Sequence, residues 1–538
     1  MKTPINRVDQ FRSEVISRFQ FEVPTLLLGS AILDNEPVSD TPVRLPLRMF
    51  NRHGLIAGAT GTGKTKTLQV LAERLSEQGV PSLMMDIKGD LSGIAAPGEE
   101  KDFITKRQAW IGETYQSSGC PVELMSLSRA PGVRLRATVS EFGPLLFSKM
   151  LGLNDTQTGM VSIVFKYADD HRLPLIDLDD FRAVINYVSG PAKSEIETHY
   201  GRMASTSVGT ILRKLLELEQ QKADDFFGEP SFQVADLCRT TTEGRGVVSI
   251  LRLMDVQDKP KLFSSFMLGL MAEIFAEFPE LGDPDRPRLV LFIDEAHLVF
   301  QEASKELLAQ LETVIKLIRS KGVGIYFCTQ SPTDIPEAIL GQLGLKIQHS
   351  LRAFTAKDRK AIKSTAENYP LSHFYQTDVE ITSLGIGEAL VVGLDPKGRP
   401  TPLVRTLLCA PRSRMDVLST EEQNHLISQS LLAAKYNTDI NPHSAFEILQ
   451  NKLQAAAGDA PTTQIPAPAP LPATRDSSLK EALGGTSRRS APRRAEKSMV
   501  EQVLTSTTAR QVARTAAREI TRGLLGVLGV KASSRSRR

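Results

Sequence analysis

Short apolar segments rich in β-branched residues alternate with longer stretches of helical period between residues 53 and 394. This alternation is typical of strand and helix units wound around a parallel sheet. Seven segments are predicted to be core strands: 53–58, 82–87, 247–253, 288–294, 323–329, 345–351 and 388–394. The pattern therefore predicts an α/β fold with a mainly parallel sheet.

The alternation stops between residues 139 and 236, where only helical periods are found. Stretches such as FGPLLFSKMLGL and SVGTILRKLLELEQQ place apolar residues three or four positions apart, which favours helices over strands. We interpret residues 139–236 as a helical insertion that divides the core into a first part, 51–138, and a second part, 237–412. Residues 1–50 then form a short N-terminal extension.

The chain beyond the core is predicted to continue as a helical segment, residues 413–457. Ser419 and Glu422 have the spacing of a capping box before a helix that extends to Tyr436. A second helix is predicted over residues 443–457.

Five prolines between Pro461 and Pro472 indicate an extended, semi-rigid linker over residues 458–497. Residues 498–538 regain helical period and are predicted to form a basic amphipathic helix and tail. One face of this C-terminal helical tail consists of Arg510, Arg514, Arg518 and Arg522. These arginines suit either an anionic phosphate or membrane surface, or plain solvation of a helix whose apolar side docks on protein. We favour the second interpretation.

The formal net charge of +3 hides an uneven distribution along the chain. Residues 480–538 carry fourteen Lys and Arg against four Asp and Glu, a balance of +10, which leaves −7 for residues 1–479. A basic tail on an acidic body argues against a surface that attracts nucleic acid everywhere. A local basic stripe is still compatible with this balance.

Composition and cysteine spacing predict a cytoplasmic protein with no integral membrane association. The four cysteines lie far apart and form no C-x-x-C pair, so neither a disulfide framework nor a zinc ribbon is indicated. The N-terminal MKTPINRVDQFRSEVISRF carries charges throughout and lacks an apolar leader segment. No uncharged apolar run is long enough to span a bilayer.

The most specific chemical motif is GATGTGKT, which directly follows the apolar segment HGLI. It fits G-x-x-x-x-G-K-[ST], the Walker A pattern, in which backbone N–H groups and a helix N-terminus surround phosphate oxygens. Lys64 supplies a charge to the β and γ phosphates, and Thr65 places a hydroxyl on Mg²⁺. The predicted nucleotide-binding residues are Gly58, Ala59, Thr60, Gly61, Thr62, Gly63, Lys64, Thr65 and Lys66. A glycine-rich turn without a ligand and a dinucleotide fold are less favoured alternatives.

A second motif, LVLFIDEAH, ends a predicted buried strand in two acids. This is the Walker B pattern, in which Asp294 at the carboxyl end of the strand holds the Mg²⁺ shell. Glu295 is then the general base that orients and deprotonates the attacking water. Alone, the motif fits equally well a strand followed by a solvated helix start, but the Walker A loop upstream favours the catalytic interpretation.

Polar residues at the ends of two further strands are weaker candidates. Gln330 follows the strand 323–329 and is either a sensor of the γ-phosphate with a catalytic role or a polar strand cap. Asp86 and Lys88, in LMMDIKGDL, either support the nucleotide site or mark a strand end that meets water.

Taken in order, GATGTGKT, DIKGDL, FIDEAH and GVGIYFCTQSP resemble the HerA/FtsK superfamily of ATPases, most closely the bacterial HerA-like helicase-domain proteins of the YjgR type. The resemblance covers residues 20 to 410 and continues into REITRGLLG in the tail. It implies a RecA-like P-loop NTPase core, ATP and Mg²⁺ as cofactors, and a homo-oligomeric ring, usually a hexamer, that pumps DNA. By position, Asp294 and Glu295 match the Walker B acids and Gln330 the sensor glutamine.

Three departures from the family pattern bear on this expectation. Only about fifty residues precede the phosphate loop, too few for the N-terminal β-barrel of DNA-pumping relatives, and there is no membrane anchor of the FtsK kind. Where related pumps place a trans-acting arginine, this sequence has Lys346, with Arg352 later in the same segment. Arg352 is our candidate for that catalytic role, and Arg319 is a weaker one.

Two functions of different classes fit the motifs. One is a Mg-ATP-hydrolysing motor that moves double-stranded DNA, and the other is an ATP-switched factor that assembles or remodels protein. A small-molecule kinase is less attractive because no compact acceptor lid is visible in the sequence.

Overall fold

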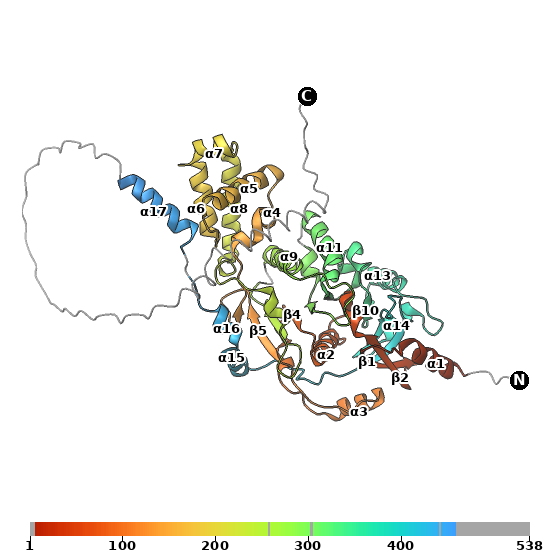
Figure 1. Ribbon diagram of the computed structural model, residues 1–538. Helices are drawn as coiled ribbons and strands as arrows, with labels where there is room; N and C mark the ends of the chain where they lie inside the picture. Colours follow the sequence, from red (N-terminus) through yellow and green to blue (C-terminus); the bar gives the residue numbers. More distant parts are fainter. Residues whose placement is uncertain (1–5, 257–258, 302–304, 441–442, 459–538) are drawn as a thin grey trace, which may run out of the picture. The chain divides into compact units, whose positions relative to one another are not determined.

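The computed structural model describes residues 6–256, 259–301, 305–440 and 443–458 (Figure 1). Residues up to 446 belong to one compact unit, and the described part of a second unit is residues 447–458 of helix α17. Apart from Gly458, the predicted linker and the basic tail with its arginine face lie outside the described residues.

The described residues form a twelve-stranded sheet in the order β2-β1-β12-β11-β10-β3-β9-β8-β4-β7-β5-β6. The eight strands from β10 to β6 in this order are parallel, while β11, β12, β1 and β2 each run antiparallel to their neighbours. The bounds are β1 Thr25–Leu33, β2 Glu36–Pro46, β3 Gly54–Ala57, β4 Ser82–Asp86, β5 Val122–Ser126, β6 Val133–Arg134, β7 Val248–Arg252, β8 Leu289–Ile293, β9 Val323–Thr329, β10 Leu345–Gln348, β11 Glu388–Val392 and β12 Val404–Leu408. The predicted α/β fold with a mainly parallel sheet is confirmed.

All seven predicted core strands are present, as β3, β4, β7, β8, β9, β10 and β11. Residues 1–50, predicted as an extension, are more than that, because β1 and β2 form a hairpin and β1 pairs with β12. Asp34 and Asn35 turn this hairpin with φ angles of 52° and 66°. Two left-handed residues suit a two-residue hairpin turn, since its twist matches that of the strands.

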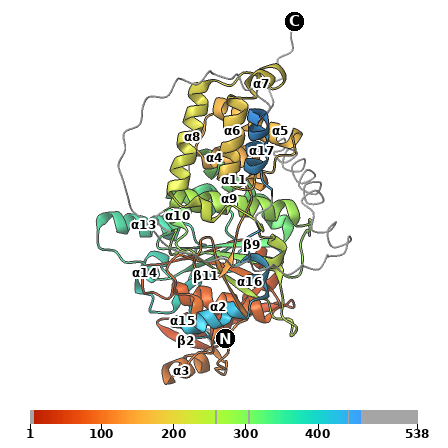
Figure 2. The same cartoon turned by 90° about the vertical axis from the view of Figure 1, so that its left-hand side faces the viewer.

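Helices cover both faces of the sheet: α2 lies on one side, and α9 and α11 lie on the other (Figure 2). The helices outside residues 139–236 have the bounds α1 Arg7–Phe19, α2 Lys64–Glu77, α3 Asp102–Ile111, α9 Pro260–Glu277, α10 His297–Gln301, α11 Lys305–Ile318, α12 Glu337–Leu340, α13 Ala356–Glu367, α14 Thr377–Ser383, α15 Thr420–Ser428, α16 Leu431–Tyr436 and α17 Ala445–Gly458. No helix among the described residues is both long and apolar enough to cross a membrane.

The predicted helical insertion follows β6 and precedes β7 along the chain. It consists of five helices that lie side by side (Figures 1 and 2). They are α4 Val139–Met150, α5 Asp155–Asp170, α6 Leu178–Ser189, α7 Lys193–His199 and α8 Ser205–Gln220. Phe147, Phe165 and Phe181 pack against one another in the core of this group. Phe142 contacts Phe226, which in turn packs edge-on against Phe266 of α9, so aromatic contacts join the insertion to the sheet's covering helices.

The prediction of one helix from Ser419 to Tyr436 is wrong, although its capping box is present. Helix α15 ends at Ser428 and α16 begins at Leu431. The break has a local cause, because the Ser430 hydroxyl accepts the N–H of Ala433 at 2.9 Å and so starts a new helix.

A polar stripe on α2 binds the segment 411–416, which follows β12. The stripe consists of Lys66, Gln69, Glu73 and Glu77, residues that share one face of the helix. The Glu73 carboxylate accepts the backbone N–H groups of Arg412 and Ser413 at 2.9 and 3.0 Å and also the Ser413 hydroxyl. Gln69 donates to the Arg414 carbonyl at 2.8 Å. The helix that begins at the phosphate loop is therefore fixed along its length.

Replacing Glu73 by alanine should destabilise the protein strongly. The buried carboxylate satisfies two backbone N–H groups and one hydroxyl, and unpartnered buried donors cost about 1–3 kcal/mol each. We expect Glu73→Ala to lower the free energy of unfolding by about 2–4 kcal/mol in chemical denaturation, because some donors will find water. Glu367→Ala, at an exposed helix end, is the matched control and should have little effect. Equal stability of the two variants would show that segment 411–416 is not held by Glu73.

Candidate nucleotide site

The carboxyl ends of three adjacent parallel strands bring the predicted site residues together. Strand β3 pairs with β9 so that Ala57 lies opposite Thr329, and β9 pairs with β8 so that Phe327 lies opposite Ile293. The phosphate loop, Gln330 and the acidic pair therefore leave the sheet at the same edge. Open α/β sheets bind ligands at this edge.

The phosphate loop follows β3 and turns back over the start of α2. Gly61 and Gly63 have φ angles of 80° and 110°, left-handed values that favour glycine. Gly58 is required for a different reason, since a Cβ there would lie 2.5 Å from the His349 Cβ. Thr62 closes the loop by donating its hydroxyl to the Ala59 carbonyl at 2.7 Å.

The residues that follow β10 contact this loop and the helix after it, which the sequence did not indicate. The Ala59 N–H donates to the Ser350 carbonyl at 2.8 Å. His349 is buried and its Nε2 lies 2.9 Å from the Thr67 hydroxyl on α2. Burial lowers the pKa of His349 to about 4, so the ring is neutral at physiological pH. The sequence gives no indication of this role, because nothing in the local pattern distinguishes His349 from any other residue at the end of a predicted strand.

The two lysines of the loop have different positions. The Lys64 Nζ donates to the Ala59 carbonyl at 3.1 Å and so lies across the mouth of the loop. Burial lowers the pKa of Lys64 despite the nearby negative groups. The Lys66 Nζ instead donates to the Met415 carbonyl and to Gln69. The prediction that Lys66 binds nucleotide therefore depends on its backbone N–H alone.

Asp294 has the features expected of a magnesium ligand. It directly follows β8, it is buried, and its Oδ2 atom has no hydrogen-bond partner among the described residues. Burial raises the pKa of this carboxyl. A bound cation would satisfy the free oxygen and remove the cost of burying the charge. Mg²⁺ keeps several waters and uses one or two protein oxygens with substrate phosphates, so Asp294 and the Thr65 hydroxyl form a sufficient protein set.

Glu295 is held by side chains from three other elements. Its Oε1 atom pairs with Lys88 Nζ, from the loop after β4. Its Oε2 atom lies 3.2 Å from His297 Nδ1 and 3.5 Å from Gln330 Nε2. The backbone of Glu295 has φ +45°, a left-handed value that costs energy for a residue with a side chain. Such strain is common at functional sites.

The electrostatic balance at Glu295 favours the ionised carboxylate. Burial alone would raise its pKa, but the hydrogen bond and charge of Lys88 outweigh burial, and the pKa is lowered. The same contact raises the pKa of Lys88 above its ordinary value, so both partners indicate an ion pair. Of the two weaker candidates, Lys88 thus joins the site, whereas the Asp86 carboxylate accepts the backbone N–H groups of Gly89, Asp90 and Leu91 and shapes the turn.

The three candidates for a trans-acting cation lie apart from these acids. Arg352 is exposed in the loop between β10 and α13. The Lys346 Nζ donates to the Asn368 carbonyl at 3.3 Å and is occupied within its own subunit. Arg319 precedes β9, at the opposite edge of the sheet, and pairs with Asp283 at 3.7 Å. Of these, only Arg352 is near the phosphate-loop edge, three residues after His349.

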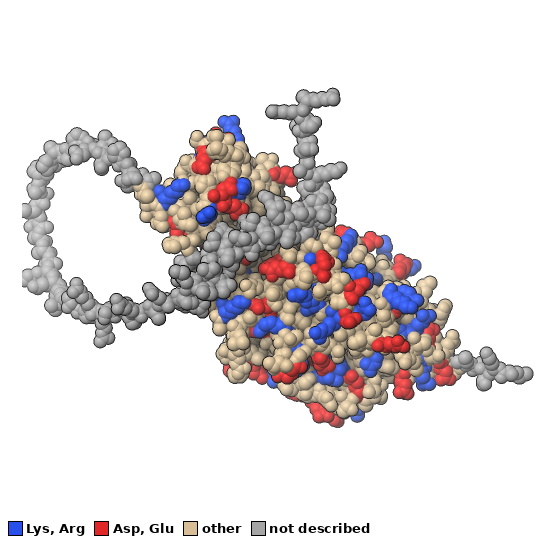
Figure 3. Space-filling model, viewed as in Figure 1, with Lys and Arg blue, Asp and Glu red and all other residues tan. Residues whose placement is uncertain are grey.

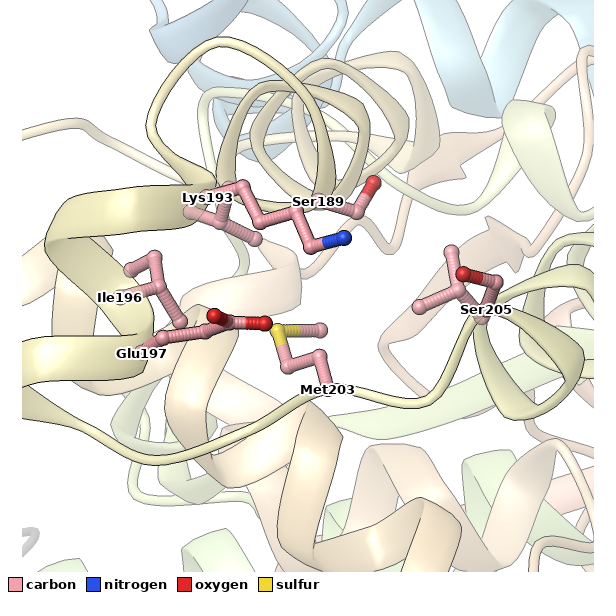
Figure 4. A pocket seen from close by; sticks show the side chains of 8 residues that line it. Ser189, Lys193, Ile196, Glu197, Met203 and Ser205 are labelled. Carbon is pink, nitrogen blue, oxygen red and sulfur yellow. The ribbon is translucent and has the colours of Figure 1, made fainter.

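A separate hollow of about 220 Å³ lies in the helical insertion, between α6, α7 and α8 (Figure 4). Lys193 and Ser189 reach into it from one side, and Glu197 and Met203 lie across from them. No residue of the phosphate loop lines it. This hollow therefore does not contribute to the site described above.

A glycine-rich loop between a parallel strand and a helix, with an acidic pair on a strand two places away, defines a P-loop NTPase. In this order β9 separates the phosphate-loop strand from the acidic strand, and it carries Gln330 between them. A family model described as helicase HerA-like C-terminal matches residues 32–533, and the chain belongs to this family. The narrower resemblance to YjgR-type proteins stays a prediction.

Curated relatives carry the same family name at low identity. The DNA double-strand break repair helicase HerA of Saccharolobus solfataricus is 23% identical over 360 residues, which cover 65% of this chain and 63% of the relative. The protein of the same name from Sulfurisphaera tokodaii is 22% identical, with 66% and 65% covered. The chain thus spans a little less than two thirds of the length of these relatives.

Solved structures show more distant similarity. The plasmid coupling protein TrwB, in complex with a non-hydrolysable ATP analogue, has a TM-score of 0.49 and 15% identity, covering 76% of this chain and 95% of that one. VirB4 of Thermoanaerobacter pseudethanolicus has a TM-score of 0.44 and 14% identity, covering 75% and 99%.

Replacing Lys64 by alanine should weaken nucleotide binding and leave the fold intact. The Lys64 Nζ bonds only the loop carbonyl of Ala59 among described protein atoms, so its loss removes no core contact. A charged hydrogen bond to phosphate contributes about 1.5–3 kcal/mol, so affinity for Mg-ATP should fall about tenfold or more in a fluorescent-nucleotide titration. Lys106→Ala, an exposed lysine on α3, is the control. Unchanged affinity in Lys64→Ala would contradict the phosphate-loop assignment.

Proposed function

We propose that this protein hydrolyses ATP with Mg²⁺ and acts as an oligomeric motor on double-stranded DNA. The observation that carries hydrolysis is the position of Glu295, an ionised carboxylate beside the magnesium candidate Asp294 at the phosphate-loop edge. A protein that only bound ATP would have no need for a second buried carboxylate there. Hydrolysis needs one to take a proton from water.

Each residue has a separate task in the proposed reaction. The backbone N–H groups of the loop and Lys64 bind the β and γ phosphates. Asp294 and Thr65 would hold Mg²⁺, which would supply positive charge to the phosphate oxygens. Glu295 orients the attacking water and accepts its proton, and Gln330 reaches the same space from β9.

Glu295→Gln should separate binding from hydrolysis. The amide keeps the size of the side chain but cannot accept the proton, so turnover should fall by about 10²–10⁴, the usual contribution of a general base. ATP affinity should stay within about twofold, because Glu295 is assigned to the water and not to the phosphates. Phosphate release and nucleotide binding are measured on the same preparation. Loss of binding equal to the loss of turnover would make Glu295 a metal-shell or structural residue.

Double-stranded DNA is the proposed polymer because of the family to which the chain belongs and the name of its curated relatives. The competing function, remodelling of protein, is favoured by the charge balance of −7 over residues 1–479. Lys and Arg are mixed with Asp and Glu on the face shown in Figure 3, without a dominant basic area in that view. A DNA contact would therefore come from a local set of cations.

The two functions are separated by ATP turnover with and without double-stranded DNA, at two salt concentrations. A DNA motor should be stimulated by DNA, and the stimulation should weaken with salt because phosphate contacts release counterions. Lys64→Ala should also nearly abolish hydrolysis, because it removes the charge assigned to the β and γ phosphates, and it serves as the blank for contaminating ATPases. An ATP turnover that is unchanged by DNA at both salt concentrations would favour the protein-remodelling function.

A homo-oligomeric ring, with a hexamer expected, is proposed because the site has an exposed arginine close by but not in it. The Ala59 N–H bonds Ser350, and Arg352 follows two residues later on an exposed loop. An arginine from a neighbouring subunit can stabilise the charge that develops during phosphoryl transfer. The fork of donors on Arg352 suits this role better than the single ammonium of Lys346.

Mixing two inactive variants tests the trans arrangement. Arg352→Ala should lower turnover by about 10³–10⁵ if the arginine acts like the arginine fingers of other P-loop NTPases. Mixed with Lys64→Ala protein, some hydrolysis should return, because a ring of both kinds contains an intact loop beside an intact arginine. Turnover per subunit of the unaltered protein should also rise with concentration. Independence of concentration, with no recovery on mixing, would indicate a self-sufficient monomeric site.

A further inference from the structure

Three side chains contact the carboxylate of Glu295. Lys88 Nζ binds one oxygen, and His297 and Gln330 lie against the other. A carboxylate that deprotonates water must take up the proton, and an ammonium bound to that carboxylate stabilises its ionised form and so weakens it as a base. The side chain of Glu295 is also only 6% exposed. The ion pair with Lys88 therefore opposes the proton transfer assigned to Glu295.

Lys88 is the one ammonium among the three contacts. Its side chain is 42% exposed, so its end can also reach solvent, whereas the His297 side chain is 20% exposed at the start of α10. Gln330 is exposed as well, but its Nε2 lies 3.5 Å from the carboxylate. The backbone around Lys88 is restrained by Asp86, whose carboxylate accepts the N–H groups of Gly89, Asp90 and Leu91. This turn therefore carries a long side chain whose end reaches both solvent and Glu295.

We propose that Lys88 is a positioning residue that restrains Glu295 in a resting state and thereby limits the basal rate of hydrolysis. The inference rests on the proposed function, since it concerns the same general base. In the resting state the ammonium of Lys88 occupies the carboxylate, and hydrolysis requires Lys88 to withdraw into solvent.

This arrangement makes the sign of the mutational effect specific. A lysine that helped the chemistry would slow turnover when removed, whereas a lysine that restrains the base speeds turnover when removed. A partly exposed ion pair shifts an equilibrium by a small factor, so the expected change is modest. The test is therefore the direction of the change in kcat together with the behaviour of KM.

The experiment measures steady-state ATP hydrolysis by the full-length Lys88→Met protein without any polymer. We expect kcat to rise by about two- to fivefold, on the scale of one partly exposed ion pair, with KM unchanged. Lys88→Arg retains a cation, so its kcat should stay below that of Lys88→Met. Lys106→Met is the control for loss of a surface lysine. An unchanged or lower kcat in Lys88→Met, or a raised KM, would overturn the proposal.

A second measurement does not depend on activity. The melting temperatures of Lys88→Met, Glu295→Gln and the double variant, without nucleotide, form a double-mutant cycle. If the ion pair exists in the resting protein, the shifts are non-additive, because the second substitution removes nothing that the first left. Additive shifts would overturn the proposal. A protein that shows this coupling but never hydrolyses ATP would instead refute the proposed function while leaving the resting contact in place.

Discussion

The register of three parallel strands fixes how far the phosphate loop lies from the acidic pair. Because β9 hydrogen-bonds to both β3 and β8, the residues that follow Ala57, Thr329 and Ile293 emerge in step. A slip of one residue would turn every side chain of a strand to the other face of the sheet. Both faces of these strands are buried, so such a slip would disrupt the side-chain packing on each face. The chemistry at the strand ends depends on this register.

The same burial creates an electrostatic cost that the site must offset. Asp294 and Lys64 are both buried. Burial raises the pKa of Asp294 and lowers the pKa of Lys64, so it favours the neutral form of each side chain. Glu295 escapes this because an ammonium lies against it. A phosphate beside Lys64 and a cation beside Asp294 would offset this cost.

Local patterns in the sequence were enough to predict the core strands, the phosphate loop and the acidic pair. These features are written in consecutive residues, so no knowledge of distant contacts is needed. The pairing of Lys88 with Glu295 joins residues 207 positions apart, and no periodicity can indicate which charge meets which. His349 was missed for the same reason. The break at Ser430 was missed because a serine inside a helical period usually causes none.

The N-terminal hairpin is a different case, because the sequence does carry a local signal for it. The polar pair Asp34 and Asn35 separates two segments that the structure shows as strands, which is the spacing of a tight hairpin. What the sequence did not offer was the partner of β1, because β12 lies almost four hundred residues later along the chain. Sheet edges closed by distant segments are determined by topology rather than by local preference.

The polar stripe on α2 has a consequence for how the family can vary in sequence. Gln69 and Glu73 are matched to backbone and hydroxyl groups of residues 412–414, so a change on the helix alters what the segment can accept. Substitutions at positions 73 and 413 should consequently appear together in an alignment of relatives, as a pair exchanged jointly. If a C-terminal region were exchanged between distant relatives, the contact between α2 and residues 412–414 would then be lost. The chimera would be destabilised there, even where the strands themselves are compatible.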